Sequence, residues 1–199
     1  EHASALDVDP RRIAVAGARQ WTQHGANPGV IQGIRGPCVS SSCEEFAMRI
    51  GVPAETKTLE GRIALVPAAC GDLVRHGHEV FVQAGAGLKS GFSDADYERV
   101  GVKIAANAKK LYEAGQMIVK VKEPIAGDLK YLRKDHLLFC YLHLAAEPKL
   151  TQRLLDIGLT GIAFESVQDD DGSLPLLAPM SVIAGRIADR KSTRLNSSH

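Results

Sequence analysis

Leu137-Leu-Phe-Cys-Tyr-Leu142 is an uninterrupted apolar run in the second half of the chain. Such a run is typical of a β-strand that is buried on both faces of a parallel sheet. A helix is indicated soon after it, from Pro148 to Ile157, because proline favours a first helical turn and Gly158 can end the last one. The apolar stretch from Met117 to Val121 indicates a neighbouring strand on the N-terminal side.

The same alternation of strands and helices extends along the rest of the chain. Further strands are predicted over 49–53, 79–83, 102–104 and 160–164. Helices are predicted over 67–76 and 107–114, over a short segment that Ser93 and Asp96 cap and that ends near Gly101, and from about Pro179 onward. Strands and helices at this spacing predict an α/β fold with a doubly wound parallel sheet, Rossmann-like or flavodoxin-like and incomplete.

Composition and charge exclude several classes of protein. The 199 residues are 45% hydrophobic and 24% charged, which suits one globular domain and excludes a disordered chain. A formal net charge of +1 offers no basic surface for nucleic acid, and no apolar run approaches the ~18 residues of a membrane helix. The four cysteines form no CxxC pair, so we expect free thiols in the cytoplasm and no metal site.

The two ends of the chain differ from its middle. Residues 189–199 read DRKSTRLNSSH, which resembles a translated library adapter and interrupts the last predicted helix. Residues 1–47 contain no methionine and are rich in Gly, Pro, Ser and Arg, so we interpret them as a poorly ordered translated leader before a true start at Met48. The natural domain is therefore predicted to span Met48 to Ala188.

Three ionisable side chains follow predicted strands. Arg62 comes after the first strand, Lys122 ends the 117–121 strand and His143 ends the 137–142 strand. Ligands of open α/β sheets bind outside the carboxyl ends of the strands. The sequence therefore predicts a ligand site built on these three residues, although a surface lysine and a buried structural histidine are the ordinary alternatives.

Other motifs carry weaker signals. Gly85-Ala-Gly-Leu-Lys-Ser-Gly91 resembles a dinucleotide fingerprint, but its third glycine comes one residue late, so a tight strand-to-helix turn is favoured. Lys120 shares a strand face with Lys122 and is interpreted as edge solvation. His76 and His78 lack a third ligand for a metal, and Cys140 lies in an apolar strand that disfavours a reactive thiolate.

Several ordered motifs of Met48 to Ala188 resemble the N-terminal region of the alanine dehydrogenase and nicotinamide nucleotide transhydrogenase family. The resemblance rests on Met48-Arg-Ile-Gly-Val-Pro-Ala-Glu55-Thr-Lys57, Glu60-Gly-Arg62-Ile-Ala-Leu-Val-Pro67, Gly77-His-Glu-Val80, Ala84-Gly-Ala-Gly87, Lys120-Val-Lys-Glu-Pro124, Tyr141-Leu-His-Leu-Ala145 and Asp171-Gly-Ser-Leu-Pro175-Leu-Leu-Ala-Pro179-Met-Ser181. The lysine and histidine motifs favour the dehydrogenase branch. Val182 departs from the glutamate that usually follows Met-Ser in this family.

The resemblance implies NAD-dependent conversion of L-alanine to pyruvate and ammonium by a cytoplasmic homo-oligomer. It implies that Arg62 and Lys122 bind the substrate, that Lys122 and His143 are catalytic, and that Ser181 contacts the cofactor. It further implies that NAD is bound mainly by a downstream domain, so the fragment alone is expected to be inactive.

Two other functions remain open at this point. One is the N-terminal region of a transhydrogenase α-subunit, which implies NADP and a membrane partner. The other is a stand-alone domain that binds small carboxylates through Arg62 and Lys122.

Overall fold

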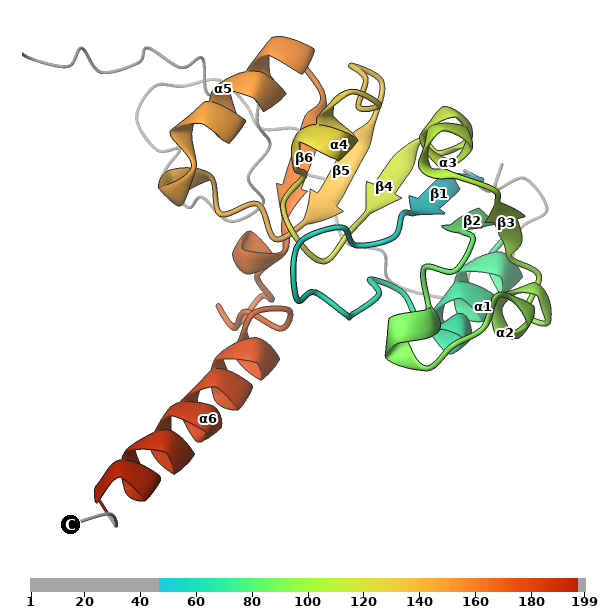
Figure 1. Cartoon of the computed structure of the whole chain (residues 1–199). Helices are drawn as coiled ribbons and strands as arrows, with labels where there is room; N and C mark the ends of the chain where they lie inside the picture. Colours follow the sequence, from blue (N-terminus) through green and yellow to red (C-terminus); the bar gives the residue numbers. More distant parts are fainter. Residues whose placement is uncertain (1–46, 197–199) are drawn as a thin grey trace, which may run out of the picture.

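The computed structural model describes residues 47–196, with side chains as far as Asp189 (Figure 1). Its centre is an open sheet of six parallel strands in the order β3-β2-β1-β4-β5-β6. The strands are β1 (Arg49–Val52), β2 (Glu79–Gln83), β3 (Lys103–Ala105), β4 (Met117–Val119), β5 (Leu137–Cys140) and β6 (Thr160–Ala163). The predicted doubly wound α/β fold is confirmed, and the strand order is the Rossmann one rather than the flavodoxin one.

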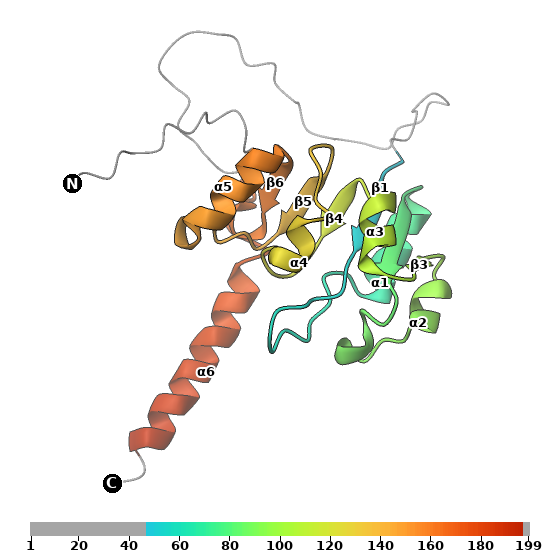
Figure 2. The same cartoon turned by 45° about the horizontal axis from the view of Figure 1, so that its top comes forward.

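The helices cover both faces of this sheet. Their bounds are α1 (Pro67–Arg75), α2 (Asp94–Glu98), α3 (Ala108–Ala114), α4 (Ala126–Leu129), α5 (Pro148–Ile157) and α6 (Ala178–Asn196), with single 3₁₀ turns η2 (Leu88–Ser90), η3 (Leu144–Ala146) and η4 (Phe164–Ser166). One core cluster joins α1 and α2 to β2 through residues such as Cys70, Val82 and Tyr97. A second joins α3 and α5 to β5 through Leu111, Leu138 and others. Figure 2 shows these helices and strands from a second direction.

Local signals in the sequence account for the helix ends. Helix α5 begins with Pro148 and ends at Gly158, which adopts a left-handed φ of 75°. Helix α2 is preceded by a capping box in which Ser93 and Asp96 satisfy each other's backbone N–H groups. Helix α4 and the 3₁₀ turns were not predicted, because three or four residues are too few to show a helical period.

The glycine-rich segment after β2 is a tight turn, as favoured from the sequence, and it leads into η2. The N–H of Gly85 donates to the Asp94 carboxylate at 2.8 Å, and the carbonyl of Gly87 accepts from Ser90 and Phe92. Gly87 is tightly enclosed, since a Cβ at this position would lie 2.8 Å from the Phe92 carbonyl oxygen and from the Tyr97 ring. The turn therefore depends on glycine for close packing.

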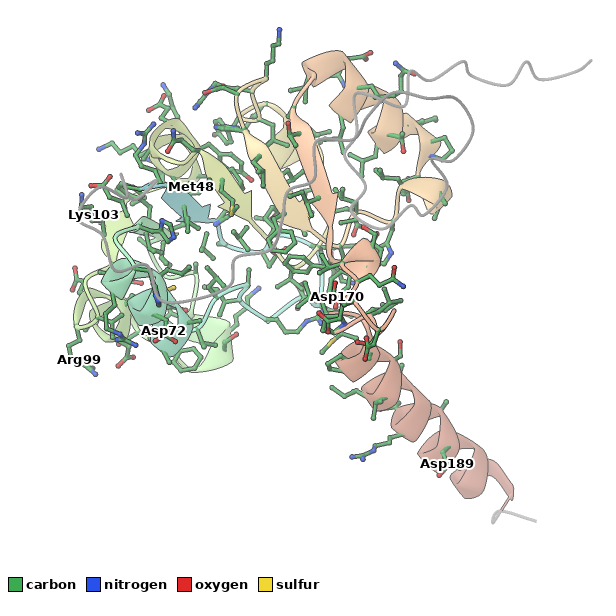
Figure 3. All side chains as sticks on the ribbon, turned by 180° about the vertical axis from the view of Figure 1, so that it is seen from behind. Met48, Asp72, Arg99, Lys103, Asp170 and Asp189 are labelled. Atoms are coloured by element: carbon green, nitrogen blue, oxygen red, sulfur yellow. The ribbon has the colours of Figure 1, made fainter. Side chains whose placement is uncertain are left out.

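Helix α6 extends away from the rest of the domain, with Asp170 near its start and Asp189 towards its far end (Figure 3). It continues past Ala188 to Asn196, so the expectation that residues from 189 onward interrupt a helix was wrong. Among the described residues of α6, the large apolar side chains that are exposed are those of Val182, Ile183 and Ile187. No helix within residues 47–196 has both the length and the apolar character needed to cross a membrane.

The proposed leader falls almost wholly on residues 1–46, which lie outside the described residues, as do Cys38 and Cys43. The reading of 189–199 as adapter-derived, and of Met48 as the start, therefore stays a prediction. Cys70 and Cys140 are buried free thiols, as expected.

The enclosure of Gly87 leads to a stability prediction. Gly87→Ala should lower the free energy of unfolding by about 1–3 kcal/mol, because the new methyl group must displace backbone and an aromatic ring. Gly127→Ala in α4 is the matched control, since nothing lies within 4 Å of its Cβ position and alanine favours a helix. Urea unfolding of the two variants checks this, and an equal or larger loss for Gly127→Ala would contradict it.

Candidate active site

The structure brings the three predicted residues to the carboxyl edge of the sheet. Arg62 lies on the long loop after β1, Lys122 lies beyond the end of β4, and His143 lies just after β5. The loops after β1 and β4 leave neighbouring strands at the point where the strand order reverses, which is the usual ligand position in such sheets. The predicted placement is confirmed, whereas the roles of the residues stay predictions.

Arg62 is held by the nearly buried carboxylate of Glu60. Its Nε and Nη2 atoms donate to the two Glu60 oxygens at 2.9 and 2.7 Å, and its backbone N–H donates to Glu60 Oε1 at 2.9 Å. These hydrogen bonds, with a smaller contribution from the charge of Lys122, lower the pKa of Glu60 to about 2 against the opposing effect of burial. Glu60 therefore stays ionised and fixes one edge of the guanidinium group.

Lys122 and Lys120 have opposite environments. Lys122 is half-buried and forms no hydrogen bond or ion pair with any residue of the described part of the chain. Lys120 is 1% exposed, and its Nζ lies 3.4 Å from Glu55 and 3.5 Å from Asp128. The interpretation of Lys120 as edge solvation was wrong, because its neighbours on the strand end are themselves buried.

The buried charges around Lys120 join separate elements. Glu55, on the loop after β1, also accepts the backbone N–H of Val121 at 2.6 Å. Asp128 in α4 accepts from the Tyr112 hydroxyl at 3.0 Å. The carboxylates of Glu55 and Asp128 thus surround the Lys120 ammonium, two residues before Lys122. They fix the backbone at this point.

His143 is the exposed residue that precedes η3, and its backbone is left-handed with a φ of 49°. Its N–H donates to Glu165 Oε1 at 2.7 Å. Its ring stacks on Tyr141, with ring centroids 5.9 Å apart and planes 10° from parallel. The imidazole is therefore accessible to a ligand, while its backbone and one neighbouring ring are fixed.

Charge effects connect the surroundings of Arg62 and His143. Burial raises the pKa of the Tyr141 hydroxyl, and the charge of Arg62 opposes this. Burial opposes ionisation of Glu123, yet a hydrogen bond from Lys57 and nearby charges, His143 among them, lower its pKa overall. Tyr141 and Glu123 therefore connect the surroundings of Arg62 and His143.

Ser181 lies in the first turn of α6, exposed, and its hydroxyl donates to the Leu177 carbonyl at 3.4 Å. The preceding residue reaches the site directly, because the Met180 sulfur accepts from Arg62 Nη1 at 3.1 Å. The Tyr141 hydroxyl also donates to the Leu176 carbonyl at 2.5 Å. The start of α6 is thus attached to the carboxyl edge, and Ser181 lies beside it.

The described residues hold no group of three or more His, Cys, Asp or Glu arranged to bind a metal ion. His78 Nδ1 accepts the Met48 N–H at 3.3 Å, and His76 contacts a helix carbonyl, so both have structural roles. Burial raises the pKa of the Cys70 thiol to about 11 and that of Cys140 further. Neither thiol is a reactive thiolate near neutral pH.

The described residues do not by themselves fit a dinucleotide. A Rossmann site needs free backbone N–H groups for the pyrophosphate on the loop after β1. That loop, residues 53–66, contains one glycine, Gly61, and no glycine-rich turn, and its carboxylates Glu55 and Glu60 are paired with Lys120 and Arg62. The glycine-rich turn after β2 is no substitute, because Asp94 already accepts the N–H of Gly85.

Comparisons with known proteins now bear on the function. The family model described as "Alanine dehydrogenase/PNT, N-terminal domain" matches residues 51–184. The chain belongs to this family. The match runs from within β1 into the first part of α6 and therefore includes Arg62, Lys122, His143 and Ser181.

Curated members of the family are similar throughout the domain. Alanine dehydrogenases of Mycobacterium tuberculosis and Bacillus subtilis are each 50% identical over 141 residues, which are 71% of this chain. The chain spans only 38% and 37% of the length of these relatives. The chemistry of the whole protein is therefore a matter of proposal.

Solved structures give the same family. An L-alanine dehydrogenase matches with a TM-score of 0.69 and 46% identity, covering 74% of this chain and 40% of that one. A transhydrogenase from Sinorhizobium meliloti matches less well, with a TM-score of 0.56 and 27% identity over 59% of this chain and 33% of that one. The dehydrogenase branch is the more similar of the two.

Sequence reasoning missed four charged residues that support the site: Glu55, Glu60, Lys120 and Glu165. A signal existed for Lys120, because a lysine enclosed by Ile118, Val119 and Val121 in an apolar strand implies a buried partner. A signal existed for Glu60 too, since it lies two residues before an arginine. Glu165 had no local signal, because its partners lie on another strand.

Lys120 and Lys122 form a natural pair for a stability test. Lys120→Met should lower the free energy of unfolding by about 3–5 kcal/mol, because it leaves two buried carboxylates without their cation. Lys122→Met should change it by no more than about 0.5 kcal/mol, because no ion pair is lost. Urea unfolding monitored by circular dichroism measures both, and equal effects would refute the assignment of the buried cation to Lys120.

The lowered pKa of Glu60 gives a pH dependence. The carboxylate stabilises the fold fully above its ordinary pKa of 4.5, and this contribution is lost as the pH falls towards about 2. Glu60→Gln should therefore cost about 1–2 kcal/mol at pH 7 and almost nothing at pH 2, with solvent around Arg62 limiting the effect. Unfolding of Glu60→Gln and of the exposed control Glu98→Gln across this range checks the sign. A cost that grows on acidification would contradict it.

Proposed function

We propose that residues 48–188 form the substrate-binding part of an NAD-dependent L-alanine dehydrogenase. The reaction converts L-alanine, NAD and water to pyruvate, ammonium and NADH with release of a proton. The observation that carries the proposal is the meeting of Arg62, Lys122 and His143 at the carboxyl edge of a domain of this family.

Arg62 binds the substrate carboxylate in this proposal. A guanidinium group has five N–H donors. Glu60 accepts from two of the side-chain donors and Met180 from a third, which leaves two for a ligand. Because Glu60 fixes the group beforehand, little side-chain entropy is lost on binding.

Lys122 supplies a positive charge that no described residue neutralises by an ion pair. Its ammonium group binds the substrate carboxylate or the carbonyl oxygen and stabilises negative charge that develops on that oxygen. The neighbouring buried charges of Lys120 and Glu55 fix the backbone from which it extends.

His143 transfers protons. It is exposed at the end of β5, and an imidazole nitrogen can both accept and donate a proton. It takes a proton from the water that adds to the imine carbon and gives one to the nitrogen that leaves as ammonia.

The hydride that leaves the substrate Cα would be accepted by NAD, if bound. The residues described here do not form its site, so we place NAD mainly on residues outside them, with Ser181 as a contact from this chain. The chain alone is then inactive. A homo-oligomeric state and a cytoplasmic location stay predictions.

The transhydrogenase alternative has less support. Lys122 and His143 have a clear task with an amino-acid substrate, whereas a transhydrogenase domain binds no amino acid. The weaker structural similarity points the same way.

A chimera tests the proposal. Residues 48–188 replace the corresponding 141 residues of the Bacillus subtilis alanine dehydrogenase, and NADH formation is followed with and without L-alanine. We expect NADH only with alanine, and a kcat at least about 100-fold lower for His143→Gln. His76→Gln is the matched control and should retain activity. A folded chimera that forms NADH at the same rate with and without L-alanine would overturn the proposal. NADH formation by the unfused chain would contradict the expectation that the chain alone is inactive.

A further inference from the structure

His143 and Leu59 are the two residues other than glycine that have a positive φ in the described part of the chain. A left-handed backbone costs such a residue roughly 1–2 kcal/mol. It persists only where surrounding contacts enforce it, and these contacts often lie at functional sites. The left-handed backbone of His143 therefore needs contacts that hold it in place.

The contacts come from Glu165, in the turn after β6. Its two carboxylate oxygens each lie 3.2 Å from the Leu142 nitrogen, and Oε1 lies 2.7 Å from the His143 nitrogen. In the sheet, Cys140 of β5 is paired with Ala163 of β6. The Glu165 carboxylate therefore accepts backbone N–H groups of the β5 segment from Leu142 onward, two residues beyond the last pair of β5 with β6.

The residue before Glu165 supports the imidazole indirectly, through the ring of Tyr141. The rings of Phe164 and Tyr141 pack edge to face, with centroids 5.1 Å apart, and Tyr141 in turn stacks on His143. The hydroxyl of Tyr141 is fixed by the Leu176 carbonyl. Phe164 and Glu165 thus hold the ring and the backbone of the same segment.

We infer that Glu165 is the positioning residue of His143: its carboxylate enforces the left-handed backbone that directs the imidazole toward the ligand region. The inference rests on the proposed function for the role of His143 in proton transfer. Glu165 acts only through the backbone and does not touch the substrate.

Both N–H groups converge on one side chain, and Oε1 lies 2.7 Å from the His143 nitrogen and 3.2 Å from the Leu142 nitrogen. A glutamine carbonyl oxygen in the same place could still accept from both groups, but it lacks the charge that strengthens the two hydrogen bonds. Glu165→Gln should therefore weaken the two hydrogen bonds in part, and Glu165→Ala should remove them.

NMR of the full 199-residue chain tests the backbone. A strong Hα–HN cross-peak within His143 reports the positive φ, and amide hydrogen exchange reports the two hydrogen bonds. In Glu165→Gln and Glu165→Ala we expect the cross-peak to weaken and exchange at Leu142 and His143 to accelerate by about tenfold or more, most in the alanine variant. Glu147→Ala is the control, because this carboxylate ends the same turn and contacts neither N–H group.

Pyruvate as a probe separates the two proposals. In the unchanged chain we expect pyruvate to shift the His143 ring resonances, and in Glu165→Ala we expect this shift to shrink while resonances near Arg62 still respond. An unchanged cross-peak, exchange rate and ring shift in folded Glu165→Ala would overturn the positioning role. The absence of any pyruvate response in the unchanged chain would count against the proposed function alone.

Discussion

The ammonium of Lys120 lies between the carboxylates of Glu55 and Asp128, and this buried group of charges joins three parts of the chain. Glu55 belongs to the loop that leads to Arg62, Lys120 follows β4, and Asp128 belongs to α4. Because each charge is nearly inaccessible to water, none tolerates the loss of its partner. The position of Arg62 relative to Lys122 therefore depends on an interaction that touches neither of them.

The three residues of the candidate site are supported in a similar way, although their side chains differ in chemistry. Each cationic or titratable group presented to a ligand is supported by a carboxylate on the protein side. Glu60 contacts the Arg62 side chain, Glu55 the backbone next to Lys122, and Glu165 the backbone of His143. These acids also offset part of the positive charge at this edge of the sheet.

The fold could be predicted from the sequence because each main strand and helix carried its own signal. The apolar run 137–142 indicated β5, and proline and glycine marked the ends of α5. The edge that carries Arg62, Lys122 and His143 followed from strand polarity alone. The supporting carboxylates did not follow, because bonds such as that from His143 to Glu165 join segments whose pairing only the folded sheet defines. The departure at Val182 has no explanation in the structure, where its side chain is exposed.

The strand order has a consequence for how the site is made. Strand β1 pairs with β2 on one side, but its partner on the other side is β4, which begins only at Met117. The half that contains β1, β2 and β3 has its own core, whereas the β1–β4 pairing must close a long loop. Arg62 belongs to this first half, and Lys122 and His143 belong to the half that is built on β4 and β5. The three residues therefore share one edge only while β1 and β4 are paired, so a change at that pairing would reach the site without touching any of its side chains.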